Sequence, residues 1–296
     1  MTPREQGFLL LTGCLGDPER HPLTVAQFRR LAKLAAAMPK PDLQRDLTES
    51  DLLRIGCDHT LARKTLQLLE QTELLQYYLH DGALMGCTPV TRIGDAYPRR
   101  LRKNLGLDAP GTLWCKGDRS ILQTSTISVV GSRDLRPENL AFAEELGKQA
   151  ALQGYTLVSG NARGADRTAQ EACLKYGGKV IAVVADALKD CPARKNVLYL
   201  SEEGFDQPFS AQRALQRNRI IHGFSEMTFV VQCSLKKGGT WRGTNDNLRR
   251  NWSRVICFAD GTQATRELEQ LGSTSVSIEE LADLSVLLPD ELNFLK

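Results

Sequence analysis

The sequence predicts an α/β protein in which a doubly wound, mostly parallel sheet follows a small all-helical region. From about residue 91 onward, short runs rich in β-branched residues alternate with amphipathic segments, and the first two runs end directly at a glycine. Residues 1–90 instead carry apolar residues at three-to-four spacing. Strand and helix alternation with nearly continuous apolar strands is typical of a parallel sheet covered on both faces.

Residues 1–90 are expected to form an all-helical N-terminal domain. Apolar residues recur at helical spacing over 28–34 and 61–75, and turns are predicted over 39–42 and 54–59. A small bundle of this kind can bind DNA, bind a partner protein or serve as a structural cap. All three roles stay open at this point.

Residues 91–285 are expected to form the sheet domain, followed by a short tail over 286–296. Ligands of doubly wound sheets bind beyond the carboxyl ends of the strands, so the loops that follow the strands are the candidate sites. The predicted strands are 126–130, 155–159, 179–184, 227–231 and 254–258, and the predicted helices lie near 137–153, 166–176, 211–223 and 244–251.

The composition is that of an ordinary globular protein. The 296 residues are 42% hydrophobic and 25% charged, which allows one large domain with a smaller companion. No apolar run approaches the roughly 18 to 20 residues of a membrane span, and the first residues lack the pattern of a signal peptide. We therefore expect a cytoplasmic protein without membrane contact.

The cysteines and histidines do not form a metal-binding pattern. The two cysteines nearest in sequence, Cys173 and Cys191, are 18 residues apart, and the four histidines are also scattered. Metal sites and disulfide frameworks show much closer spacings. The sequence therefore predicts reduced thiols, no metal and no cofactor.

Positive charge is concentrated in one part of the chain. The net charge is only +3, but residues 210–254 contain nine Lys or Arg against Glu226 and Asp246. Such asymmetry suits an anionic partner, because neutralised phosphates release their counterions. A basic face that is simply solvated is the alternative.

Two glycine-containing loops follow the first two predicted strands. In the first, Gly131 lets the backbone approach a phosphate, Ser132 offers a hydroxyl and Arg133 offers a forked cation. The second, 159–166, precedes a helix whose N-terminal amides can cradle an anion, and Asp166 is predicted to cap that helix. Neither loop is a Walker loop or a dinucleotide fingerprint, which disfavours ATP hydrolysis and hydride transfer.

A basic helical segment and a second glycine-rich loop come later in the chain. Arg213 and Arg217 lie four residues apart on one helical face, where like charges repel by a few tenths of a kcal/mol. An anion would relieve that repulsion, and pairing with a carboxylate such as Glu202 or Glu203 is the alternative. The basic loop 236–244 contains Trp241, which either stacks on a base or packs in the core.

Taken in order, these motifs resemble the DNA-processing protein A family, also called DprA or Smf. The matching stretches begin with Gly94-Asp95-Ala96-Tyr97-Pro98 and Leu113-Trp114-Cys115-Lys116-Gly117-Asp118. They continue with Gly131-Ser132-Arg133, Ser159-Gly160-x-Ala162-x-Gly164-x-Asp166 and Gln216-Arg217-Asn218-Arg219-Ile220-Ile221-x-Gly223. The likeness covers about residues 91–282.

The resemblance implies an extended Rossmann-like fold that is often dimeric and binds single-stranded DNA without reading its sequence. It also implies a role in DNA uptake or recombination, with loading of the RecA recombinase, rather than enzymatic activity. By position, the resemblance adds Arg194 and Lys195 to the DNA groove. The complete set of predicted nucleic-acid and phosphate ligands is Gly131, Ser132, Arg133, Ser159, Gly160, Ala162, Arg163, Gly164, Asp166, Arg194, Lys195, Arg213, Arg217, Asn218, Arg219, Lys237, Gly238, Gly239 and Thr240.

The chain departs from the family pattern at two places. The histidine usual after the Gly-x-Asp motif is absent from 168–170, and the family's Ser-Gly-x-x-x-Thr-Ala stretch is replaced by 237–244. The second stretch is similar to the Gly-Gly-x-Gly-Thr loop of LOG-type phosphoribohydrolases, whose glutamate assists cleavage, but this chain has Asn247 three residues after Thr244. A nucleotide sensor or nucleotide-cleaving enzyme of that superfamily is the alternative function.

Overall fold

The computed structural model describes residues 1–37 and 46–288. The turn predicted over 39–42 and all but the first three residues of the predicted tail, 286–296, lie outside the described residues. Within the described ranges no helix is both long enough and apolar enough to cross a membrane.

Helices form the first part of the chain because each begins at a residue suited to that place. The Thr2, Thr24 and Thr48 side chains each accept a hydrogen bond from the backbone amide three residues on, as Asp58 also does. The helices are α1 (Pro3–Thr12), α2 (Val25–Ala36), α3 (Glu49–Arg54), α4 (His59–Leu69) and α5 (Thr72–Leu84).

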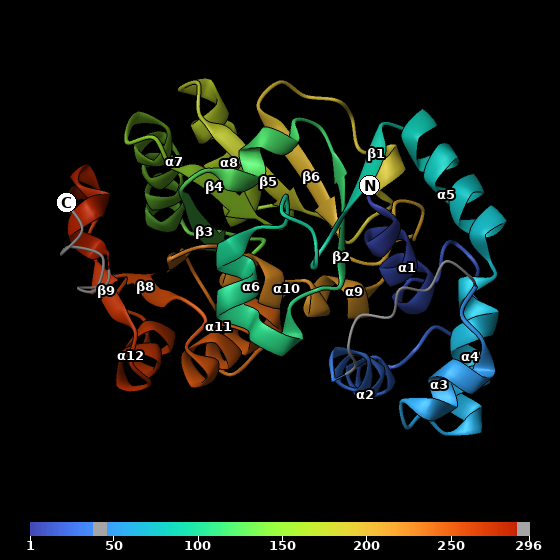
Figure 1. Ribbon diagram of the computed structural model, residues 1–296. Helices are drawn as coiled ribbons and strands as arrows, with labels where there is room; N and C mark the ends of the chain where they lie inside the picture. The colour runs from blue at the N-terminus through green and yellow to red at the C-terminus, as the bar shows by residue number, and fades with distance from the viewer. Residues whose placement is uncertain (38–45, 289–296) are drawn as a thin grey trace.

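One mixed sheet forms the centre of the molecule, with the strand order β1-β2-β6-β5-β4-β3-β7-β8-β9 (Figure 1). The pairs β1–β2 and β2–β6 are antiparallel and the other pairs are parallel. This confirms the predicted doubly wound, mostly parallel α/β fold. The strands are β1 (Cys87–Thr91), β2 (Thr112–Lys116), β3 (Thr126–Val130), β4 (Thr156–Ser159), β5 (Lys179–Val183), β6 (Val197–Ser201), β7 (Met227–Val230), β8 (Arg254–Phe258) and β9 (Thr274–Val276).

The order of the strands reverses at β3. From β3 the chain adds β4, β5 and β6 on one side, then returns to place β7, β8 and β9 on the other. The carboxyl ends of β3 and β7 therefore lie side by side, with their connections leaving in opposite directions. Such a topological switch point leaves a crevice beyond the carboxyl ends of the two strands.

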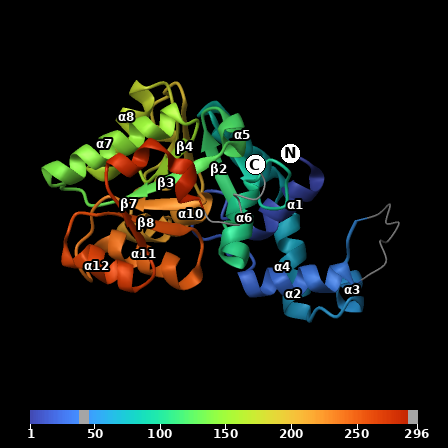
Figure 2. The same cartoon turned by 90° about the vertical axis from the view of Figure 1, so that its left-hand side faces the viewer.

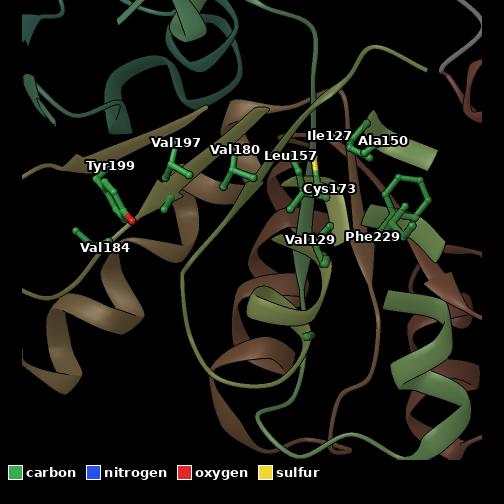
Figure 3. Packing of buried hydrophobic residues seen from close by; sticks show 14 of the residues in the cluster. Ile127, Val129, Ala150, Leu157, Cys173, Val180, Val184, Val197, Tyr199 and Phe229 are labelled. Atoms are coloured by element: carbon green, nitrogen blue, oxygen red, sulfur yellow. The ribbon is translucent and has the colours of Figure 1, made fainter. Parts of the chain in front are cut away.

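Helices cover both faces of the sheet (Figure 2). On one face, Phe142 and Cys173 pack against Ile127 and Val129, part of the cluster drawn in Figure 3. On the other face, Ile220 belongs to a second buried cluster. The covering helices are α6 (Arg99–Leu105), α7 (Pro137–Leu152), α8 (Ala165–Lys175), α9 (Ala211–Gln216), α10 (Asn218–Phe224), α11 (Gly238–Arg250) and α12 (Gln263–Gln270), with 3-10 turns at Gly106–Asp108, Arg119–Gln123, Leu188–Asp190, Glu279–Ala282 and Leu284–Leu287.

The helical region is joined to the sheet through a shared core. Leu9 of α1 and Leu75 and Tyr78 of α5 belong to the same buried cluster as the sheet residue Trp114. Helices α2, α3 and α4 instead enclose a smaller cluster of their own, which includes Leu31 and Leu61. The Tyr78 hydroxyl also donates a 2.8 Å hydrogen bond to Asp206, in the loop that follows β6.

Two of the predicted helix limits were wrong. The single helix expected over 211–223 is divided into α9 and α10, with Arg217 between them. The helix expected from about 244 begins at Gly238, whose φ of +79° lets the chain turn directly into α11. The helix was predicted too late because glycines in a first turn have low helix propensity and indicate a loop.

Candidate nucleic-acid interface

A cavity of about 700 Å³ lies at the topological switch point, between the loops that follow β3 and β7. It is open to solvent, and backbone from three loops and the start of α11 lines it. The structure brings together at this cavity most of the predicted ligands, namely Gly131, Ser132, Arg133, Ala162, Asp166, Arg217, Asn218, Lys237, Gly238, Gly239 and Thr240.

The loop after β3 is held close to its neighbours by Gly131 and Ser132. A Cβ on Gly131 would lie 2.4 Å from the Cβ of Ala165, so no larger residue fits without a shift. The Ser132 amide and hydroxyl both donate to the carbonyl of Gln232, at 2.9 and 3.1 Å. Ser132 therefore positions the loop, while the exposed Arg133 makes no ion pair within the described part of the chain.

Asp166 holds the loop after β4 in shape. Its carboxylate accepts hydrogen bonds from the amides of Gly160 (3.0 Å) and Ala162 (3.2 Å), both upstream of α8. The predicted role as the cap of α8 was wrong, because the N-cap residue is Gly164 and Asp166 lies inside the first turn. Burial raises the pKa of Asp166, against the opposing effect of Arg217 and the two amide hydrogen bonds.

The guanidinium of Arg217 lies directly on Gly160. Its Nη2 donates to the Gly160 carbonyl at 2.9 Å, and a Cβ on Gly160 would lie only 1.5 Å from Nη1. The Nε of Arg217 is buried and has no hydrogen-bond partner within residues 1–37 and 46–288. Gly160 is thus the residue that gives this arginine its place beside the cavity.

The N-terminus of α11 forms another wall of the cavity. Lys237 is the exposed N-cap residue, and no side chain caps the amides of the first turn. The Thr240 hydroxyl donates to the Gly131 carbonyl at 3.0 Å and so ties α11 to the loop after β3. Free amides and the helix dipole make such an end attractive to an anion.

Besides Gly160, three predicted residues of the second glycine loop lie next to the cavity without lining it. Ser159 is buried and accepts a 2.6 Å hydrogen bond from Gln170. Gly164 has a φ of +83° and leaves room for the carbonyl of Arg133. Arg163 pairs with Asp134 at 2.6 Å on the exposed rim.

Two predicted arginines of the basic helical segment 211–223 are also engaged by carboxylates. Arg213 pairs with Glu203 at 2.6 Å and Arg219 pairs with Glu202, which confirms the carboxylate alternative for Arg213. Arg213 also donates to three backbone carbonyls of neighbouring loops, so it anchors the start of α9. Neither arginine lines the 700 Å³ cavity.

Arg194 and Lys195 lie at the amino ends of the parallel strands, opposite to the carboxyl ends where the cavity lies. They immediately precede β6, which is parallel to β5, whereas the cavity lies beyond the carboxyl ends of the strands. Arg194 pairs with Glu171 of α8 at 2.9 Å. The structure therefore does not bring this pair together with the other predicted ligands.

Two apolar residues at the mouth of the cavity were not predicted from the sequence. Phe209 is 55% exposed and Leu215 is 43% exposed, and both line the cavity beside Arg217. The only signal for Phe209 was an aromatic residue shortly before a basic helix. Trp241, which was expected either to stack on a base or to pack in the core, is buried in the core, and this confirms the packing alternative.

A second, larger groove of about 1100 Å³ continues from the cavity. The two share Leu215, Asn218 and Gly239, and the far wall of the groove is formed by Val25 and Arg29 of α2. Several of the charged side chains that line this groove form ion pairs with one another, for example Arg250 with Asp108. No group of three or more residues that could hold a metal occurs in the described ranges.

Fold and site together define a Rossmann-like α/β protein with a cavity at the switch point of its sheet that is lined by Arg133, Arg217 and Lys237. Comparison with known proteins narrows this class. The chain belongs to the DNA recombination-mediator protein A family, whose sequence model matches residues 89–270. The resemblance inferred from the motifs is thereby confirmed.

The relatives are similar to only part of this chain. Protein Smf of Escherichia coli is 32% identical over an alignment of 142 residues, which covers 44% of this chain and 38% of that protein. The DNA processing protein DprA of Streptococcus pneumoniae is 32% identical over an alignment of 157 residues, which covers 49% of this chain and 54% of that protein. The match thus spans about half or less of the length of these relatives.

Two solved structures share the fold. DprA from Streptococcus pneumoniae superposes with a TM-score of 0.71 at 23% identity, covering 98% of this chain and 99% of that one. A structure of DNA processing protein A from Helicobacter pylori, described for its single-stranded DNA binding mode, superposes with a TM-score of 0.57 at 22% identity and covers 68% of this chain and 96% of that one. At these identities the likeness is one of fold.

Proposed function

We propose that this protein binds single-stranded DNA without reading its sequence. The observation that carries the proposal is a cavity at which Arg133, Arg217 and Lys237 converge with the uncapped N-terminus of α11. Among the residues the structure describes, none of the three side chains forms an ion pair with a carboxylate, although Arg217 lies near the buried Asp166. Unpaired cations and free amides are what a phosphate backbone requires. The H. pylori neighbour, described as binding single-stranded DNA, supports the same partner.

The mouth of the cavity suggests how the strand is held. Phe209 exposes an aromatic face beside the cations, where an unpaired base can stack whatever its identity. Contacts to phosphates from Arg133 and Lys237 position the strand but carry no sequence information. A duplex hides its base faces, so we expect it to bind more weakly than a single strand.

Binding rather than cleavage is the proposed activity. The position where a LOG-type hydrolase would need a carboxylate holds Asn247, which is fully buried. Its side chain accepts a hydrogen bond from the Ser253 amide and donates to the Ser253 hydroxyl and to His222. An amide tied into the core in this way has neither the charge nor the freedom to assist glycosidic cleavage.

Within recombination, we propose that the DNA-bound form acts as a homodimer that loads RecA on the strand. Family membership supports this role. Light scattering with and without oligonucleotide measures the oligomeric state, and RecA filament growth on a coated strand measures loading. A monomer under both conditions, or filament growth unaffected by this protein, would contradict the corresponding part.

The test of DNA binding is a titration of labelled oligo-dT at several salt concentrations. Three phosphate contacts predict a slope of log K against log salt of about −2 for a single strand. Arg133→Ala, Arg217→Ala and Lys237→Ala should each weaken binding and flatten the slope by about 0.7. Lys175→Ala is the matched control. This exposed lysine is the last residue of α8, near the amino ends of the strands and away from the cavity.

The outcomes separate the candidate functions. Absence of oligo-dT binding at low salt, or equal affinity in all four variants, would refute the proposal. Release of free base from a nucleoside monophosphate would instead favour the hydrolase of the LOG-like superfamily.

A further inference from the structure

Unpartnered polar atoms gather beneath the cavity. Of the buried side-chain atoms without a hydrogen-bond partner in the described residues, Arg217 Nε, His222 Nε2 and Thr244 Oγ1 belong to the adjoining helices α10 and α11 or to the junction before them. Arg217 and His222 both line the cavity. Buried polar groups are normally satisfied, so a cluster of unsatisfied ones beside a cavity points to a missing polar ligand.

The hydrogen-bond network identifies the free atom of His222 as a donor. The Ser253 amide donates to Asn247 Oδ1 at 2.9 Å, which fixes the orientation of that amide side chain. Asn247 Nδ2 therefore donates to His222 Nδ1 at 3.1 Å, and the ring proton must sit on Nε2. Burial, with a smaller effect from Arg217, lowers the pKa of His222 to about 3, so the ring stays neutral and keeps this tautomer.

Two carboxylates line the cavity, but both are engaged: Asp134 pairs with Arg163, and Asp166 accepts from two backbone amides. The groups that remain without partners are donors and cations. Arg217 offers Nε–H, His222 offers Nε2–H, and the first turn of the thirteen-residue α11 offers uncapped amides beside Lys237. These groups come from three places in the chain, namely the junction before α10, α10 itself and the start of α11, and we call the buried part of the cavity beside Arg217 and His222 its floor. They suit a ligand group that has several acceptor oxygens and enters with one end first.

We propose that the floor of this cavity is a site for a phosphomonoester, either the terminal phosphate of a DNA strand or the phosphate of a free nucleoside monophosphate. A monoester presents three unesterified oxygens and nearly two negative charges, whereas a phosphate within a strand presents two oxygens and one charge. Only the monoester has one unesterified oxygen for each of the three donors: Arg217 Nε, His222 Nε2 and the amides of α11. The inference rests on the proposed DNA binding and adds a preference for strand ends to it.

The glycine at position 243 lies directly beside the buried donor of His222. A Cβ built on Gly243 would lie 3.1 Å from His222 Nε2, and no atom is nearer to that position. A methyl group there would cover the donor while keeping the imidazole in place. Gly243→Ala therefore removes the proposed contact without removing the buried ring.

The experiment compares three oligo-dT strands of equal length, carrying a 5′-phosphate, a 3′-phosphate or hydroxyls at both ends. Thymidine monophosphate and thymidine serve as competitors. One added charge-assisted contact predicts about tenfold tighter binding of a phosphorylated strand, since that factor corresponds to about 1.4 kcal/mol. A gain at one end without competition by the nucleotide assigns the site to strand ends, and competition by thymidine monophosphate but not thymidine assigns it to free nucleotides.

Variants attribute the effect to the floor of the cavity. His222→Phe, which keeps the ring volume but lacks the donor, and Gly243→Ala should each abolish the gain while the hydroxyl-ended strand still binds. Gly7→Ala on α1, where a Cβ would meet only Leu69 Cδ2 at an ordinary contact distance of 4.0 Å, is the control. Equal affinity of the three strands with no competition by the nucleotide, or a gain that persists in both variants, would overturn the inference. Failure of the hydroxyl-ended strand to bind would instead count against the proposed DNA binding.

Discussion

Gly160→Ala should weaken DNA binding while the protein remains folded. The new methyl would lie 1.5 Å from Nη1 of Arg217, so the guanidinium must leave its place beside the cavity. The obstructed group is the end of a flexible side chain, and the backbone at Gly160 is not in the left-handed region. Replacing Gly by Ala there also restricts the unfolded chain, which contributes about 0.4 to 1 kcal/mol of stability and offsets part of the lost hydrogen bond. The free energy of unfolding should therefore fall by about 0.5 to 2.5 kcal/mol, which leaves the protein folded.

The expected loss of DNA affinity follows from one contact. A hydrogen bond to a charged group contributes about 1.5 to 3 kcal/mol, so the dissociation constant for oligo-dT should rise roughly ten- to hundredfold. Fluorescence anisotropy at low salt measures it, with Gly7→Ala as the control. In the Arg217→Ala background the same substitution should have no further effect, because the group it displaces is absent. Unchanged affinity for Gly160→Ala would refute the assignment of Arg217 to the site.

Three further outcomes are expected. Arg194→Ala should leave the affinity for oligo-dT unchanged, because this residue pairs with Glu171 at the amino ends of the strands; a clear loss would return it to the DNA path. Trp241→Ala should lower the free energy of unfolding by about 3 to 5 kcal/mol in denaturant titrations, as for other core aromatics, and a smaller cost would favour a stacking role. An unfolded histidine titrates near 6.5 and His222 near 3, so the unfolded state binds more protons below pH 6.5 and stability from this residue is lost as the pH falls from 6.5 towards 3, by up to about 1.4 kcal/mol per unit. His222→Phe should flatten that part of the stability profile, and an unaltered profile would contradict the assignment.

The central strands could be predicted from sequence because they are buried on both faces. The run 126–130 is apolar or β-branched except at Ser128 and is followed by a glycine, and the structure has β3 at the same residues. In contrast, β9 has only three residues, and β1 contains a proline because it is an edge strand. Such strands are stabilised by their neighbours rather than by a local pattern, which explains why they were not predicted.

The site could be predicted as a set of loops but not as a set of free and engaged side chains. Glycines after apolar strands indicated the loops at the carboxyl edge, and the cavity contains them. Whether an arginine is available depends on long-range neighbours: Arg213 is held by Glu203, from the loop after β6, a strand that was not predicted. The rim residue Phe209 lies outside any periodic pattern, so only the packed fold reveals its exposure.

The shared core of the helical region and the sheet limits how this chain can be divided. Tyr78 and Phe205 pack against Trp114, with ring centroids 5.1 Å from Trp114 in both cases. A fragment that starts at residue 91 would lose most of β1 and leave Trp114 without its cover from α5. Grafting the helical region of one relative onto the sheet of another would also mismatch these rings. Both regions should therefore melt in a single transition, and substitutions on the α5 side of this junction can alter the DNA site through Asp206 and the loop leading to Phe209.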